Sequence, residues 1–209
     1  IRKTDLLLNR LIQRAMERPP GSDVAYINRT IKQGKAIGWK RLKAKLAYPN
    51  DYLVVGKPNE NSLSVTLLGN RTIWFIGCED PNASLGSGFI HIASDETSIN
   101  YHLPEMWSTV FQPMLSDKLG TADFVMTPRG KGWSYQMWKR GCPEYPKDYD
   151  PTWLSFNVPT RLAGTVPVDE LARLKRDMGD DWYEQEYECR FLDYVGLAAH
   201  QFLRSPVAE

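Results

Sequence analysis

The chain has 209 residues, of which 42% are hydrophobic and 24% are charged, and its formal net charge is +1. These values are ordinary for a soluble globular protein with one sizeable core, and so small a net charge indicates no particular class of partner. The wide spacing of Cys78, Cys142 and Cys189 argues for reduced thiols in a cytosolic protein and against a disulfide framework or a zinc site, and no apolar run approaches the roughly 18 residues of a membrane span.

Predicted helices and strands alternate along the chain. Apolar periodicity and breaker residues predict helices at 4–18, 30–48, 104–118, 132–141, 167–179 and 180–192. The same signals predict strands at 23–28, 62–68, 71–77, 89–94, 121–127 and 152–158, and a tight polar turn joins 62–68 to 71–77 as a hairpin. Such alternation is typical of an α/β fold with a mainly parallel central sheet flanked by helices, here with a β-hairpin added.

Charge is distributed unevenly along the sequence. No Asp or Glu occurs between Val24 and Asn50, where the basic residues are Arg29, Lys32, Lys35, Lys40, Arg41, Lys43 and Lys45. The helix predicted at 30–48 could therefore face DNA phosphates without reading bases, through Lys40, Arg41, Lys43 and Lys45. A solvated helix face is the alternative interpretation.

An acidic pair, Asp95 and Glu96, follows the strand predicted at 89–94. In open α/β sheets, ligands bind at the carboxyl ends of the strands, which is where this pair is expected. In nucleotide hydrolases, an Asp at this place helps to hold Mg²⁺ and the adjacent Glu orients the attacking water. Taken alone, the pair fits the start of an exposed loop better, so the functional interpretation depends on other segments.

Two other segments offer polar groups at a strand or helix end. Arg2, Lys3 and Thr4 precede the first predicted helix, and Lys-Thr matches the last letters of a Walker A loop that binds phosphate at a helix N-terminus. Arg2 stands where that motif has glycine, and alone a Lys-Thr pair before a helix is usually a cap. Thr127 ends the strand predicted at 121–127, which alone fits a simple strand stop before Pro128.

The order and spacing of these three segments resemble the ATPase domain of the large terminase subunit of tailed bacteriophages, the motor that packages DNA. The resemblance covers nearly the whole chain and includes "DVAYINRTIKQGKAIGWKRLK", "RTIWFIGCEDPNASLGSGFIHIASDET", "FVMTPRGKGWSYQMW" and, most distinctively, "GTVPVDELARLKRDMGDDWYEQEYECRFLD". It implies a P-loop NTPase fold of the ASCE type over residues 1–195, with 196–209 as a tail or the start of a linker to a nuclease domain. No nuclease activity is expected from residues 1–209.

The resemblance also implies roles, with ATP and Mg²⁺ as cofactors. The implied nucleotide-binding residues are Arg2, Lys3 and Thr4. Thr4 and Asp95 would hold Mg²⁺, Glu96 would activate water, and Thr127 would couple the phosphate state to movement of the DNA-gripping part. These groups supply positioning and electrostatic stabilisation of the transferring phosphoryl group.

One departure from the family concerns the arginine finger. The family commonly has Leu-Arg-Gly before the strand that carries the acidic pair, whereas this sequence has Ser84-Leu85-Gly86. Arg129 and Arg140 are the candidate replacements.

The expected function is an ATP-hydrolysing motor that moves viral double-stranded DNA into a prohead. The implied partners are DNA, the portal protein, the small terminase subunit and further copies of the chain in a ring, with no membrane, in the cytoplasm of the infected host on the procapsid. Two alternatives stay open: a helicase-like P-loop translocase, and a non-hydrolysing DNA-binding or assembly module with a degenerate Walker A loop.

Overall fold

The structure is a computed structural model and describes residues 3–80 and 88–193. The chain divides into two compact units, an N-terminal unit over Arg2–Met126 and a C-terminal unit over Thr127–Glu209. The acidic pair and the first helix both lie in the N-terminal unit.

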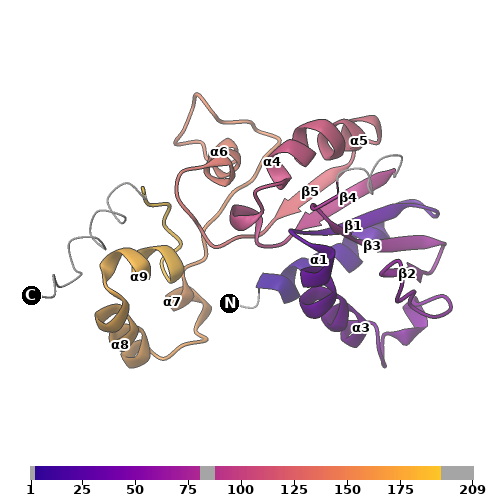
Figure 1. The fold of residues 1–209 in the computed structure, drawn as a ribbon, viewed down its shortest axis with the longest axis horizontal. Helices are drawn as coiled ribbons and strands as arrows, with labels where there is room; N and C mark the ends of the chain where they lie inside the picture. The colour runs from indigo at the N-terminus through magenta and orange to yellow at the C-terminus, as the bar shows by residue number, and fades with distance from the viewer. Residues whose placement is uncertain (1–2, 81–87, 194–209) are drawn as a thin grey trace, which may run out of the picture. The chain divides into compact units, whose positions relative to one another are not determined.

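The N-terminal unit is built on one five-stranded sheet in the order β2-β3-β1-β4-β5 (Figure 1). The strands are β1 (Asp23–Asn28), β2 (Ser64–Leu67), β3 (Arg71–Gly77), β4 (Phe89–Ser94) and β5 (Thr121–Phe124). β1 pairs in parallel with β3 and β4, and β4 pairs in parallel with β5. β2 is antiparallel to β3, which confirms the predicted hairpin. The carboxyl ends of the parallel strands β1, β3, β4 and β5 therefore lie at one edge of the sheet.

Helices cover both faces of this sheet. The helical segments are α1 (Lys3–Glu17), α2 (Ile31–Gly34), η1 (Lys35–Trp39), α3 (Lys40–Lys45), η2 (Asp51–Leu53), η4 (Thr97–Ile99), α4 (Leu103–Met106), η5 (Trp107–Phe111) and α5 (Gln112–Asp117). Figure 1 shows α1 and α3 on one face and α4 and α5 on the other. Because β1 and β4 are covered on both faces, their side chains are almost all buried.

The basic segment predicted as one helix is continuous but contains a π-helical turn at Lys35–Trp39. Thr30 caps it, as predicted, by accepting a hydrogen bond from the Gln33 N–H at 3.1 Å. Gly38 in that turn allows close approach to the sheet, because a Cβ there would lie 2.7 Å from ring atoms of both Tyr26 and Phe75. The segment is thus pressed onto the face that α1 also covers.

The core of the N-terminal unit lies between the sheet and the α1–α3 face. Its buried residues are Leu7, Leu8, Leu11, Ala15, Val24, Tyr26, Trp39, Leu42, Leu46, Leu63, Val65, Leu67, Ile73, Phe75 and Ala93. The apolar stripe of α1 provides four of them, as its helical periodicity predicted. This packing fixes the N-terminus of α1 over the sheet.

The C-terminal unit contains α6 (Trp133–Arg140), α7 (Thr160–Ala163), α8 (Val168–Met178) and α9 (Asp180–Glu186). The strand predicted at 152–158 is wrong, since this segment forms no strand. Its backbone bonds instead to nearby turns: Trp153 N–H donates to Asp150 O, and Ser155 N–H donates to Gly141 O. Leu154 and Phe156 are 82% and 70% exposed, so the apolar alternation that suggested a strand has no covering layer among the described residues.

Two further boundaries differ from the predictions. β5 ends at Phe124 rather than at Thr127, and α9 ends at Glu186 rather than at residue 192. The tail expected at 196–209 lies outside the described residues. None of the helices in the described part of the chain has the length and hydropathy needed to cross a bilayer.

Candidate functional site

Thr4 and Asp95 meet at the edge of the sheet where β4 ends. The Thr4 hydroxyl, in the first turn of α1, donates a hydrogen bond to Asp95 Oδ2 at 2.7 Å. Asp95 follows β4 directly, and its N–H donates to Ile27 O of β1 at 3.1 Å. The structure thus brings together two residues that the sequence separates by 91 positions and that the sequence analysis paired as a magnesium site.

Asp95 is 5% exposed and has a third partner that the sequence analysis missed. The Tyr26 hydroxyl, on β1, donates to Asp95 Oδ2 at 2.6 Å. Burial, followed by the Asp95 charge, raises the pKa of Tyr26 far above its usual range, so this hydroxyl stays protonated and donates. Nothing in the sequence distinguishes Tyr26 from an ordinary apolar core residue of a buried strand.

Glu96 adopts a left-handed backbone conformation, with φ 49° and ψ 41°. Its N–H donates to Asp95 Oδ1 at 3.0 Å, so both Asp95 oxygens are engaged. A non-glycine residue in this region costs about 1–2 kcal/mol.

The donor set at this edge suits Mg²⁺ bound together with a nucleotide. A hydroxyl has one proton and two lone pairs, so Thr4 can donate to Asp95 and still offer oxygen lone pairs to a cation. Mg²⁺ is usually bound by one or two protein oxygens plus water and substrate phosphates, and not by an all-protein cage. The described residues contain no cluster of three or more His, Cys, Asp or Glu that could hold a metal alone.

Lys3 is the first residue of α1 and adjoins Thr4. Phosphate binding at a helix N-terminus depends on its free N–H groups and on the helix dipole. Arg2, the other expected nucleotide-binding residue, lies outside the described residues, and so do Ser84, Leu85 and Gly86, where the family's arginine is missing.

Most basic residues predicted to bind DNA form ion pairs within the N-terminal unit. Arg41 and Lys45 each lie 3.4 Å from the Asp5 carboxylate, in the first turn of α1. Lys43 lies 2.5 Å from Glu60. Lys40 is exposed and has no such partner in residues 3–80 and 88–193.

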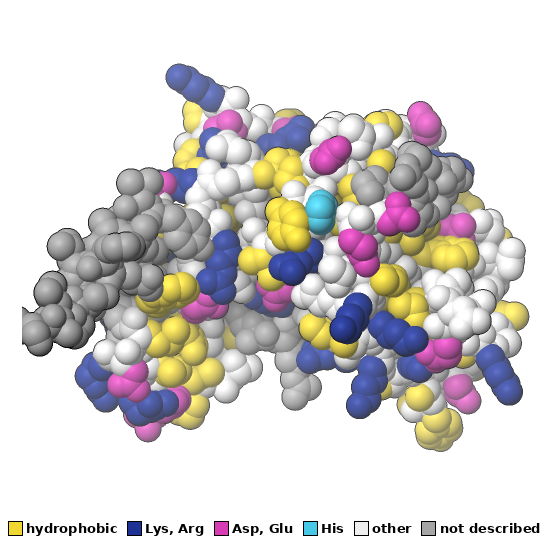
Figure 2. Space-filling view, in the orientation of Figure 1, with side chains coloured by type: hydrophobic (Ala, Val, Ile, Leu, Met, Phe, Trp, Pro, Cys, Tyr) yellow, Lys and Arg dark blue, Asp and Glu magenta, His cyan; other side chains and the backbone are white. Residues whose placement is uncertain are grey.

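Figure 2 shows basic side chains gathered over the α3 region, interspersed with acidic ones. These ion pairs fasten α3 to α1 and to the loop before β2, so they account for part of the charge run without DNA. The structure therefore separates Lys40 from the other three candidates.

The C-terminal unit holds the candidates for coupling and for the arginine finger. Thr127 is half-buried at the start of this unit. Arg129 lies 2.6 Å from Glu186 and over the ring of Trp182. Both of these side-chain contacts are with α9.

Arg140, at the end of α6, is also engaged. It lies 3.3 Å from Asp150, and its guanidinium carbon is 4.7 Å from the ring centroid of Trp153. Either arginine would have to leave an intramolecular ion pair before serving a neighbouring subunit.

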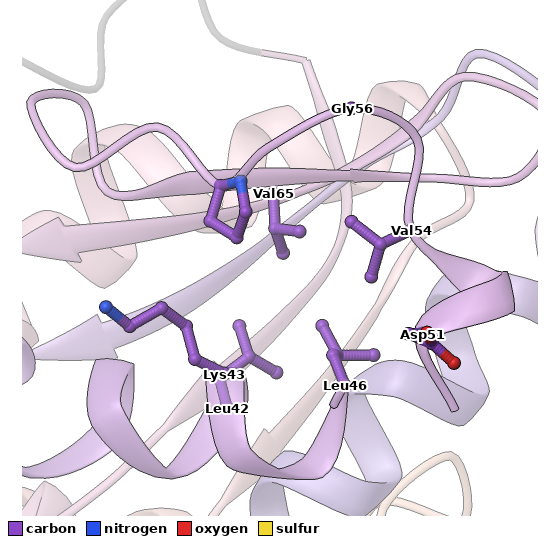
Figure 3. Close-up of a pocket in the computed structure, with 8 residues that line it drawn as sticks. Leu42, Lys43, Leu46, Asp51, Val54, Gly56 and Val65 are labelled. Atoms are coloured by element: carbon purple, nitrogen blue, oxygen red, sulfur yellow. The ribbon is translucent and has the colours of Figure 1, made fainter. Parts of the chain in front are cut away.

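A pocket of about 380 Å³ lies elsewhere in the N-terminal unit. Its lining residues are Leu42, Lys43, Leu46, Asp51, Val54, Gly56, Pro58 and Val65. Figure 3 shows that aliphatic side chains from α3, the loop after η2 and β2 converge there, with the Lys43 stem along one side. Of the predicted site residues, only Lys43 lines this pocket.

Comparison with known proteins gives similarity to phage terminases. No family model matches the chain. The terminase large subunit of Escherichia phage T5 is 21% identical over 160 residues, which are 77% of this chain and 35% of that protein. The chain therefore spans about a third of the length of the curated relative it matches.

Solved structures give the same type of domain. The ATPase domain of the Thermus phage P74-26 large terminase matches 91% of this chain and 86% of that chain, with a TM-score of 0.74 and 18% identity. The large terminase of another thermophilic bacteriophage, in complex with ADP, matches 90% of this chain and 44% of that chain, with a TM-score of 0.63 and 13% identity. These comparisons confirm the resemblance to large terminase ATPase domains, and with it the expected α/β, P-loop NTPase fold.

Proposed function

We propose that this chain is the ATP-hydrolysing motor domain of a large terminase subunit and drives double-stranded viral DNA into a prohead. The observation that supports this most is the 2.7 Å hydrogen bond from Thr4 to Asp95, which joins the N-terminus of α1 to the end of β4. The similarity to large terminases supports the same proposal.

Each residue at the sheet edge has a part in this proposal. Arg2, Lys3 and the first N–H groups of α1 bind the phosphates. Thr4 and Asp95 hold Mg²⁺, which would neutralise charge that develops on the phosphoryl group. Glu96, directly after Asp95, accepts a proton from the attacking water. Thr127 couples the phosphate state to motion.

The proposed partners follow from the motor role. They are duplex DNA, the portal protein, the small terminase subunit and further copies of the chain in a ring on the procapsid, in the cytoplasm of the infected host. Lys40 is the basic residue of α3 best placed to contact DNA, because it is exposed and has no ion-pair partner among the described residues. Arg129 and Arg140 remain the proposed sources of an arginine finger.

The test is ATP turnover by the longest natural form of the protein, with and without duplex DNA, at several protein concentrations. Replacement of Glu96 by Gln removes the proton acceptor and keeps the size of the side chain, so turnover should fall about 100-fold or more. Nucleotide binding should stay within about threefold of wild type, since Glu96 is not proposed to hold the nucleotide.

The outcomes separate the alternatives. A wild-type protein that binds nucleotide but never hydrolyses it, at any concentration and with DNA, contradicts the motor and favours the non-hydrolysing module. Hydrolysis that drives strand separation rather than packaging favours the helicase-like translocase. If the Glu96→Gln protein hydrolyses ATP as fast as wild type, Glu96 is not the residue that accepts the proton from water.

A further inference from the structure

We propose that Tyr26 is a positioning residue of the magnesium site, which holds the Asp95 carboxylate in the orientation that Mg²⁺ binding requires. The inference rests on the proposed function and adds a residue that neither the sequence nor the comparisons assign. Its basis is the hydrogen bond from the Tyr26 hydroxyl to Asp95 Oδ2, 2.6 Å long and buried.

The contacts of Asp95 account for three of its four lone-pair positions. Oδ2 accepts from Thr4 Oγ1 at 2.7 Å and from Tyr26 at 2.6 Å. Oδ1 accepts from the Glu96 N–H at 3.0 Å. Each carboxylate oxygen accepts about two hydrogen bonds, so Oδ2 is filled, and Oδ1 keeps one position toward a cation or its water shell. Without Tyr26, the carboxylate could rotate and exchange its two oxygens.

The ring of Tyr26 is held by close packing. It is fully buried, and its centroid lies 4.7 Å from that of Phe75. The backbone of Gly38 closes the space beside Cε1, where a Cβ would come within 2.7 Å. A buried ring that cannot turn carries its hydroxyl to one place, and partners of metal ligands act through such fixed orientation.

The Tyr26 hydroxyl also stabilises the charge of the buried Asp95 carboxylate. Asp95 is 5% exposed, and a buried charge needs hydrogen-bond donors. Thr4 supplies one such donor, but in the proposed site its hydroxyl oxygen must also contact the cation. The Tyr26 hydroxyl has no access to solvent, and its single proton is donated to Asp95.

The test compares wild type with Tyr26→Phe, which removes one oxygen and keeps the ring. Binding of fluorescently labelled ADP is measured by anisotropy while Mg²⁺ is titrated, and again in EDTA. We expect the Mg²⁺ concentration for half-maximal binding to rise about 10-fold, as for other partners of metal ligands, while ADP affinity in EDTA stays unchanged. A purely structural role would lower the unfolding temperature without this Mg²⁺-specific change.

Controls keep the result interpretable. Tyr183→Phe removes the hydroxyl of another buried tyrosine, in the C-terminal unit, and should leave the Mg²⁺ dependence at the wild-type value. If Tyr26→Phe does not fold, Gly38→Ala replaces it, because the added Cβ would lie 2.7 Å from both the Tyr26 and the Phe75 rings, and displacing the Tyr26 ring should raise the Mg²⁺ requirement in the same direction.

The experiment distinguishes a failure of the Tyr26 proposal from a failure of the proposed function. If wild type binds ADP with Mg²⁺ and Tyr26→Phe, or Gly38→Ala in its place, shows an unchanged Mg²⁺ requirement, only the role of Tyr26 is overturned. If wild type binds no nucleotide with or without Mg²⁺, the proposed function and this inference both fail.

Discussion

The Thr4 hydroxyl lies 2.7 Å from Asp95 Oδ2 and links the first turn of α1 to the end of β4. The two elements pack through the core that α1 shares with the sheet, so this contact is set by the fold. A site formed in this way is preorganised, because its groups need little rearrangement when a ligand arrives.

Replacement of Thr4 tests that contact. Thr4→Val keeps the shape of the side chain but removes the donor to Asp95 and the oxygen for Mg²⁺, so Mg²⁺-dependent binding of ADP should weaken about 10-fold or more. Thr4→Ser keeps the hydroxyl and should stay within about threefold of wild type. Isothermal titration calorimetry with Mg²⁺-ADP measures both. Equal affinities of Thr4→Val and Thr4→Ser would contradict the role of the hydroxyl.

The left-handed turn at Glu96 predicts a conflict between stability and activity. Asn tolerates this backbone region better than Glu, so Glu96→Asn should raise the free energy of unfolding by up to about 1 kcal/mol while ATP turnover is lost. Urea unfolding and a phosphate-release assay measure the two quantities. Glu105→Asn, in α4 and away from any left-handed turn, is the control and should not stabilise the protein. A Glu96→Asn protein that is clearly less stable than wild type would refute the strain argument.

Lys40 and Lys43 should differ in DNA binding. Loss of one phosphate contact lowers the slope of log affinity against log salt by about 0.9, so Lys40→Ala should reduce the slope by about one and weaken binding at low salt. Lys43→Ala should change DNA binding less, because this side chain is already paired with Glu60. Filter binding of duplex DNA at three salt concentrations measures the slopes, with Lys57→Ala, at an exposed lysine outside α3, as the control. Identical slopes for wild type and Lys40→Ala would favour the solvated-face interpretation of α3.

His91 predicts a loss of stability in mild acid. It is fully buried on β4, and burial lowers its pKa to about 4, although Asp123 opposes the shift. Its other charged neighbours, Arg10, Arg14 and Arg18, act in the same direction as burial. Between pH 6.5 and about 4, the unfolded chain, with a histidine pKa near 6.5, therefore binds a proton at His91 that the folded protein does not bind. The free energy of unfolding is highest above pH 6.5 and decreases as the pH falls toward 4.

The expected slope is at most about 1.4 kcal/mol per pH unit within that window. Urea unfolding between pH 6.5 and about 5, above most carboxyl titrations, measures it. His91→Gln should flatten the slope, whereas His102→Gln, at a histidine that is not fully buried, should not. A wild-type protein whose stability does not change across that range would contradict the buried neutral His91.

Much of the N-terminal unit is predictable from the sequence because its signals are local. The stripe of α1, the Thr30 cap, the hairpin turn and the buried run of β4 all depend on neighbouring residues and agree with the structure. The prediction of a strand at 152–158 was wrong because a strand must pair with another strand, which can be distant in the sequence. Apolar alternation within the segment does not show whether such a partner exists.

The candidate site is predictable only in part for the same reason. The pairing of Thr4 with Asp95 followed from a family resemblance, since no local pattern connects two such distant residues. Tyr26 was missed because its ring belongs to the core and only its hydroxyl reaches Asp95. The ion pairs of Arg41 and Lys45 with Asp5 were also invisible, because they depend on how α3 packs beside α1.

The most direct test of a nucleotide-linked Mg²⁺ site at Asp95 is calorimetric binding of ADP to wild type and to Asp95→Asn, with Mg²⁺ and in EDTA. Asn keeps the size of the side chain and removes the charge that would attract the cation. We expect Mg²⁺ to strengthen ADP binding to wild type about 10-fold or more, and we expect this gain to disappear in Asp95→Asn while affinity in EDTA is retained. An equal Mg²⁺ gain in both proteins, or no ADP binding by wild type, would contradict such a site.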